Sequence, residues 1–314
     1  MPRSPCPSTG CVLATSYLDW YLSGSMFRLA RYLRFAFWRA FQHDQFAIAK
    51  GAAYSSILTL FPTLLVVASG LVSVGNREVF REFTYAVARI LPAGTGGPVR
   101  VLIERRSHPI GILIPTALVT LWTASGIFIS WMEGFRAAYR MPKVWGIVHE
   151  RLISFLLVFL TFVPMLFATA LMAFGNQIET WLAIQAGHDI GPYILLLWTA
   201  GRWLIASATS VLVILLIYHW GVPRIAPWHL SLPGALLATG LWFPATVLFG
   251  WYLRRFSTYS ILYGSLGTAM ALLVWMYIIS IVILVGAEFN ALIFPKRLTG
   301  QPLDEALQRE LQVR

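Results

Sequence analysis

The segment from residue 230 to residue 294 constrains the fold of this chain more than any other. It contains two apolar runs, and one short polar and aromatic connection, residues 254–263, separates them. A helix rises about 1.5 Å per residue, so about 20 apolar residues cross a hydrocarbon core of about 30 Å. Residues 268–287 supply that length, and the first charge after them is Glu288. The sequence therefore predicts a membrane protein.

The composition favours one membrane domain and no separate soluble one. Hydrophobic residues make up 58% of the 314 residues and charged residues only 12%, whereas soluble domains carry about 25% charged residues. We expect the membrane domain over residues 26–296 and a short cytoplasmic tail over residues 297–314. Residues 1–25 are expected to form a disordered tail, or the protein starts at Met26.

Six membrane-spanning helices account for the apolar runs, which predicts an all-α polytopic membrane protein. The helices are expected near residues 52–75, 109–132, 152–175, 192–219, 232–253 and 264–294. A further amphipathic helix is expected before them, because arginines and apolar residues fall on different arcs of a helical wheel. The two arcs are Arg28, Arg31, Arg34 and Arg39, and Leu29, Leu33, Phe37 and Phe41. Such a helix lies in the membrane interface with its arginines on anionic lipid headgroups.

The net charge of +11 predicts membrane-lipid partners and an orientation, and no nucleic acid. Most of the 24 Lys and Arg residues lie in the two terminal segments and the second connection, and cytoplasmic membrane faces collect such residues. We therefore expect both termini in the cytoplasm. The basic residues form no compact patch of the kind that binds nucleic acid. The two cysteines, Cys6 and Cys11, leave the body of the chain without a disulfide or a cysteine metal site.

Four sequence blocks carry a resemblance to a known family. They are KGAAYSSILTLFPTLL from Lys50, LWTASGIFISWMEGFRAAYR from Leu121, YHWGVPRIAPWHLSLPGALLATGLW from Tyr218 and YSILYGSLGTAMALLVWMYIISIVILVGAEFNALI from Tyr259. In this order they resemble the YihY/BrkB family of bacterial inner-membrane proteins, a UPF0761-like group formerly mislabelled as ribonuclease BN. Arg136 stands where the family pattern leads us to expect Asn.

The resemblance implies six helices in a bacterial inner (plasma) membrane and no settled activity. It draws attention to Tyr54 and Pro62 in the first spanning helix. Transport, including that of envelope lipids, is an activity proposed for such proteins.

Three prolines fall near the middle of predicted spanning helices: Pro62, Pro164 and Pro244. Each removes a backbone donor and leaves a carbonyl that lipid does not satisfy. Hydroxyl groups of the preceding turns, such as those of Thr59 and Thr239, are expected to satisfy these carbonyls. Broken helices at this depth surround the substrate sites of transporters, and the alternative is an ordinary kink in a packed bundle.

Charged and aromatic residues mark two further places on the predicted path. Arg202 lies about ten residues inside the fourth helix, where it would bind a phosphate or carboxylate. The alternative is that this helix starts nearer Trp203, and the Arg202 side chain then snorkels to the outer interface. Tyr259 and Tyr263 in the last connection form an interfacial belt, or they line an outer mouth at which neighbouring arginines attract an anion.

Glu288 and Asn290 close the sixth helix and are expected to form a structural lock at the helix end, or a gate or ion site. On the same face, Lys50, Arg136 and Arg140 are the expected partners of Glu288.

Enzyme chemistry is not supported. The six histidines show no metal-binding spacing, and the chain has no P-loop. We expect no catalytic residue, cofactor or metal.

The leading hypothesis is a transporter or lipid translocator for an anionic, amphiphilic solute. The alternative is a non-transporting membrane scaffold for envelope partners, and an intramembrane hydrolase comes third. The sequence leaves the substrate, the coupling ion and the oligomeric state open.

Overall fold

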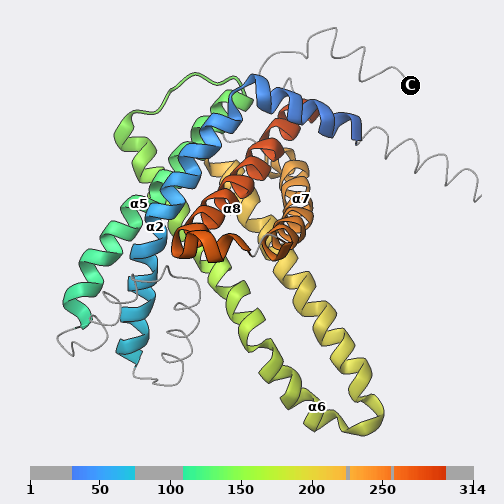
Figure 1. Cartoon of the computed structure of the whole chain (residues 1–314). Coiled ribbons are helices and arrows are strands. Elements are labelled where there is room, and N and C mark those ends of the chain that lie inside the picture. Colours follow the sequence, from blue (N-terminus) through green and yellow to red (C-terminus); the bar gives the residue numbers. More distant parts are fainter. Residues whose placement is uncertain (1–29, 75–108, 224–226, 256–257, 295–314) are drawn as a thin grey trace, which may run out of the picture.

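The computed structural model describes residues 30–74, 109–223, 227–255 and 258–294. These residues form helices and short turns, with no strand among them (Figure 1). The expected tails over residues 1–25 and 297–314 lie outside the described residues, as does the whole first connection.

A first helix over residues 30–42 precedes five longer ones. The longer helices are α2 (Gln45–Val74), α5 (Pro109–Ala138), α6 (Ile147–Trp220), α7 (Trp228–Arg255) and α8 (Thr258–Ile293). Six stretches are long and apolar enough to cross a membrane: Gln45–Val67, Leu113–Ala138, Ile147–Ala168, Leu196–Trp220, Trp228–Leu253 and Ala269–Ile293. The prediction of an all-α protein with six membrane-spanning helices is therefore confirmed.

Helix α6 differs from the expected pair of separate helices. Its 74 residues are helical throughout, and Figure 1 shows that it folds back on itself as a long hairpin. The predicted third and fourth spanning helices are the two arms of this hairpin, Ile147–Ala168 and Leu196–Trp220. The tip of the hairpin extends away from α2 and α5 (Figure 1).

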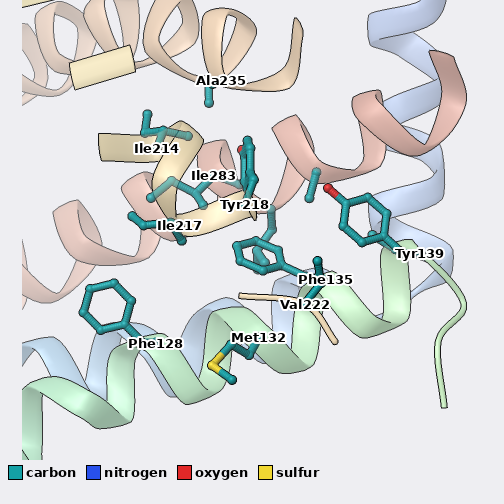
Figure 2. Packing of buried hydrophobic residues seen from close by; sticks show 14 of the residues in the cluster. Phe128, Met132, Phe135, Tyr139, Ile214, Ile217, Tyr218, Val222, Ala235 and Ile283 are labelled. Atoms are coloured by element: carbon teal, nitrogen blue, oxygen red, sulfur yellow. The ribbon is translucent and has the colours of Figure 1, made fainter. Parts of the chain in front are cut away.

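The packed core gathers where α5, α6, α7 and α8 meet (Figure 2). Phe135 of α5 and Tyr218 of α6 contact edge to face, with ring centroids 5.3 Å apart, and the Tyr218 hydroxyl donates to the Ile283 carbonyl of α8 at 2.5 Å. Because lipid is as apolar as these side chains, close packing and hydrogen bonds hold such helices together. The same core explains why α5 continues six residues past its predicted end at Met132: Phe135 and Ala138 are fully buried in it.

The helix over residues 30–42 packs on α8 through a second cluster, in which Phe35, Ala36 and Ala40 meet Val285 and Phe289. The faces of this helix differ from the expected ones. Arg39, which we placed on the lipid-headgroup arc, is only 6% exposed and points into the protein. The exposed arc instead carries three large aromatic residues together with Arg34: Phe37, Trp38 and Phe41. Burial against α8 therefore overrides the separation of charge that the helical wheel suggested.

Candidate functional site: a buried carboxylate cluster

Glu288 is the centre of the candidate site. It lies in α8 within the membrane-spanning stretch Ala269–Ile293, and none of its surface is exposed. An ionised side chain at such a place is costly unless it is paired and hydrogen-bonded. Its partners therefore decide what the site can do.

The end of the first helix, the turn that follows it and the start of α2 carry those partners. Asp44 adopts a positive φ of 53°, which short polar residues tolerate better than most. This turn places Arg39, His43 and Gln45 beside α8.

Three side chains contact the Glu288 carboxylate. His43 Nδ1 lies 2.6 Å from Oε1, and Gln45 Nε2 donates to the same oxygen at 3.0 Å. Arg39 Nε lies 3.4 Å from Oε2 as an ion pair. Arg39 and Gln45 also donate to the backbone carbonyls of Ala138, at 3.3 Å, and of Gly134, at 2.9 Å. The cluster therefore joins the first helix, α2, α5 and α8.

A proton must lie between His43 and Glu288. At 2.6 Å, a lone pair on Nδ1 would repel the lone pairs of Oε1, so either the histidine donates to the carboxylate or the carboxyl group donates to the histidine. The side chain of His43 is 18% exposed, whereas that of Glu288 is fully buried. His43 is therefore the member of this pair that water can reach.

Asn290 ties the same end of α8 to α7. Its Oδ1 accepts a hydrogen bond from the Gly234 amide at 2.6 Å, and its Nδ2 donates to the Ser231 carbonyl at 3.3 Å. Any side chain at Gly234 would collide with the Gly286 carbonyl and the Asn290 amide. This glycine therefore lets α7 come within hydrogen-bonding distance of Asn290.

Tyr139 is buried beside the cluster, just past the end of α5. Burial raises the pKa of the Tyr139 phenol well above its usual value; the Asn290 side chain lowers this pKa in part, and the nearby Glu288 raises it further. Tyr139 is therefore neutral at physiological pH.

Two of the expected partners of Glu288, Arg136 and Lys50, do not pair with it in the described part of the structure. Arg136 instead pairs with Glu150 of α6, whose other oxygen lies 3.5 Å from Lys143 Nζ. Lys50 is exposed on α2, and the ion pairs of Glu288 within the described residues do not include it. Arg136 therefore ties α5 to the start of α6, whereas Lys50 lies on the surface.

A separate cavity of about 280 Å³ lies between α2, α5 and α8. Its lining is mostly apolar, with hydroxyl groups from α2 and α8. The lining residues are Ser56, Thr59, Leu60, Thr63, Ile127, Trp131, Met276, Ile279 and Ser280. Pro62 lies in the same turns of α2, but it is not itself a lining residue.

None of the three prolines lines this cavity. Pro62 and Pro164 are half-buried in α2 and α6, and Pro244 is exposed on α7. The hydroxyls expected to satisfy their free carbonyls do not do so. Thr59 donates to the Ser55 carbonyl at 2.7 Å, and the buried hydroxyl of Thr239 has no hydrogen-bond partner among the described residues.

The remaining predicted path residues are scattered. Arg202 is half-buried, six residues after the start of the stretch Leu196–Trp220, so it lies about 9 Å along the helix from that end. Tyr54 is 61% exposed on α2. Tyr259 and Tyr263 belong to the first turns of α8, where the side chains lie outside the described part.

Sequence reasoning missed Arg39, His43 and Gln45, and also Arg151. Arg151 of α6 donates to the Ser125 hydroxyl of α5 at 2.7 Å, and its guanidinium lies 4.2 Å from the Trp122 ring centroid. The polar run from Gln42 to Gln45, between two apolar helices, was the feature of the sequence that could have pointed to His43 and Gln45.

Comparison with known proteins identifies the family. Residues 36–309 match the family described as Virulence factor BrkB. The chain belongs to this family. The matched region includes Arg39, His43, Gln45 and Glu288, and the expected YihY/BrkB resemblance is confirmed.

Three relatives illustrate the range of the family. The ribonuclease-like protein YfkH of Bacillus subtilis is 26% identical over 269 residues, which cover 85% of this chain and 96% of the relative. A UPF0761 membrane protein of Tolumonas auensis is 29% identical and covers 81% of this chain and 83% of the relative. Another, from Laribacter hongkongensis, is 26% identical over 84% of this chain but only 61% of its own length. No solved structure matches.

Proposed function

We propose that this protein is a transporter or lipid translocator of the bacterial inner membrane, with cytoplasmic termini and an anionic, amphiphilic cargo. One observation supports this most directly. Glu288, buried in a membrane-spanning helix, is held by Arg39 and His43 from outside that helix. Ionisable groups inside membrane proteins are expensive and mark pathways and gates.

The cluster has the chemistry of a lock that an anion can open. It holds the first helix against α8 through contacts between the carboxylate of Glu288 and the side chains of Arg39 and His43. An anionic headgroup would compete with Glu288 for these two side chains, because the N–H groups of arginine and histidine bind phosphate as well as carboxylate. Release of the first helix would then open this end of the bundle.

The cavity between α2, α5 and α8 suits the apolar part of such a cargo. Its lining is mostly apolar, and its hydroxyl groups give it a few polar positions. Ser280 of its lining precedes Glu288 by eight residues in α8, a distance of about 12 Å along the helix. The cavity therefore lies behind the lock, on the way into the membrane.

The proposal assigns the chain no catalytic step. Within the described residues, no group of three or more His, Cys, Asp or Glu side chains could hold a metal ion. The ribonuclease-like name belongs to the relative YfkH. In the cluster described above, the side chains that contact the Glu288 carboxylate already occupy it.

Reconstitution tests the proposal. The purified full chain in phosphatidylcholine vesicles should move a fluorescent phosphatidylglycerol between leaflets faster than empty vesicles do. Glu288→Ala and Arg39→Ala should raise the basal rate because they open the lock, whereas the exposed Lys50→Ala should leave it unchanged. Movement of labelled anionic lipid or solute no faster than in empty vesicles would overturn the proposal and favour a membrane scaffold.

A further inference from the structure

The outward face of the first helix carries a groove that the Glu288 cluster does not use. The groove has a volume of about 590 Å³ and is lined by five aromatic residues and one basic residue. These are Arg34, Phe35, Phe37, Trp38, Phe41 and Phe46. Its floor is the apolar cluster that joins this helix to α8, in which Phe35 is buried and Phe46 half-buried.

The aromatic walls of the groove stand out from the protein. Trp38 is 57% exposed and Phe41 67% exposed, and their rings stack with centroids 6.3 Å apart. Large aromatic side chains at adjacent positions are unfavourable in water. They are favourable at the level of lipid headgroups, where one side of a ring meets hydrocarbon.

Arg34 gives the groove a charge. It is exposed, and its guanidinium carbon lies 5.3 Å from the centroid of the Phe35 ring. Of the other two arginines of the expected arc in this helix, Arg31 is not a lining residue of the groove and Arg39 points inward to Glu288. The lining therefore offers one guanidinium at an aromatic slot, and a guanidinium binds a phosphate through two parallel hydrogen bonds.

We propose that this groove binds one anionic phospholipid of the surrounding bilayer, with its phosphate on Arg34 and an acyl chain along Trp38 and Phe41. A second copy of the chain fits less well, because a two-fold contact through the groove would bury the Arg34 of each copy, and the lining of the groove contains no acidic residue to pair with it. This site is separate from the lock and from the cavity, and it holds whether or not the protein moves lipid.

Competition between lipids tests the site. The purified full chain is given equal amounts of phosphatidylglycerol and phosphatidylcholine, and native mass spectrometry counts the lipids that stay bound. The wild type should retain phosphatidylglycerol preferentially, and Arg34→Ala should lower that preference about fivefold. Phe41→Ala should weaken retention of both lipids, because it removes part of the apolar wall that either acyl chain contacts.

Two matched controls separate this site from general lipid contact. Lys50→Ala removes an exposed cation of α2, and Phe159→Ala removes an aromatic residue of α6 that is 58% exposed; neither should change retention. Equal loss of phosphatidylglycerol in Arg34→Ala and Lys50→Ala would overturn the proposal. It would also fail if the wild type were dimeric and Phe41→Ala made it monomeric. All four positions are exposed, so unchanged thermal unfolding is expected and is checked for each variant.

Discussion

At the scale of single residues, the Glu288 carboxylate explains why a charged arginine is buried in a helix that would otherwise lie on the membrane. The sequence indicated a lock or gate at Glu288 and a basic partner for it, but the expected partners Arg136 and Lys50 do not contact it in the described part of the structure. Arg39 is 249 positions away, and its wheel position beside Arg31 and Arg34 made it look lipid-facing. The direction in which the Arg39 side chain points depends on how the first helix packs on α8. A local sequence pattern does not specify that packing.

The Arg39–Glu288 pair should contribute strongly to stability. Removing one partner of a buried ion pair leaves an uncompensated charge, so Arg39→Leu should lower the free energy of unfolding by about 3–5 kcal/mol. The double variant Arg39→Leu/Glu288→Leu should lose clearly less than the sum of the two single losses. Detergent-denaturant titration measures all three, and additive losses would mean that the pair does not interact. Lys50→Leu, at an exposed position, should change stability by no more than about 0.5 kcal/mol.

Tyr139 should make the protein sensitive to alkali. Its raised pKa means that the folded protein holds the phenolic proton more tightly than the unfolded chain does. Its contribution to stability is therefore complete below the ordinary tyrosine pKa of 10.0 and is lost as the pH rises above that value. Thermal unfolding between pH 9 and about 11.5 should fall less steeply for Tyr139→Phe than for the wild type. Identical slopes for the wild type and Tyr139→Phe would contradict this assignment.

At the scale of helices, hydropathy was sufficient to predict the six spans, because about 20 apolar residues are needed to cross a bilayer and few other structures satisfy that length. The ends of the helices were less predictable. α5 runs on to Ala138 because Phe135 and Ala138 pack in the core. The turn of α6 stays helical throughout, although Gly175 and Pro192 suggested a break between two helices. Both differences arise from the backbone and from packing rather than from hydropathy.

The α7–α8 contact depends on a glycine that allows close approach. In Gly234→Ala, the added methyl group would meet the Gly286 carbonyl and the Asn290 amide, so the helices would have to separate. We expect a loss of about 1–3 kcal/mol of unfolding free energy. Gly240→Ala on the same helix is the matched control, because nothing lies within 4 Å of its added methyl group. That control should be neutral or up to about 1 kcal/mol more stable, since alanine favours a helix over glycine. Equal effects at the two positions would show that the close contact is unimportant.

At the scale of the whole molecule, the buried side chains of the described residues gather toward the Glu288 end. There the first helix, α5 and α8 meet through Arg39 and the two apolar clusters. Away from that end, the α6 hairpin diverges from α2 and α5 (Figure 1). The sequence predicted six spans and a polar helix end in α8, whereas this uneven packing depends on contacts between residues far apart in the chain. This gathering of buried contacts among the described residues at the Glu288 end is suited to a lock there.

The most direct test of this lock is to close it reversibly and follow transport. Tyr32 and Phe289 contact across it, with ring centroids 6.4 Å apart, and the chain's only two cysteines, Cys6 and Cys11, lie in the N-terminal tail. In a Cys6→Ser/Cys11→Ser background, Tyr32→Cys and Phe289→Cys are joined by a short reducible thiol cross-linker in proteoliposomes. Cross-linking should lower the movement of fluorescent phosphatidylglycerol to the level of empty vesicles, and reductant should restore it. Movement that continues unchanged in fully cross-linked protein would contradict the account.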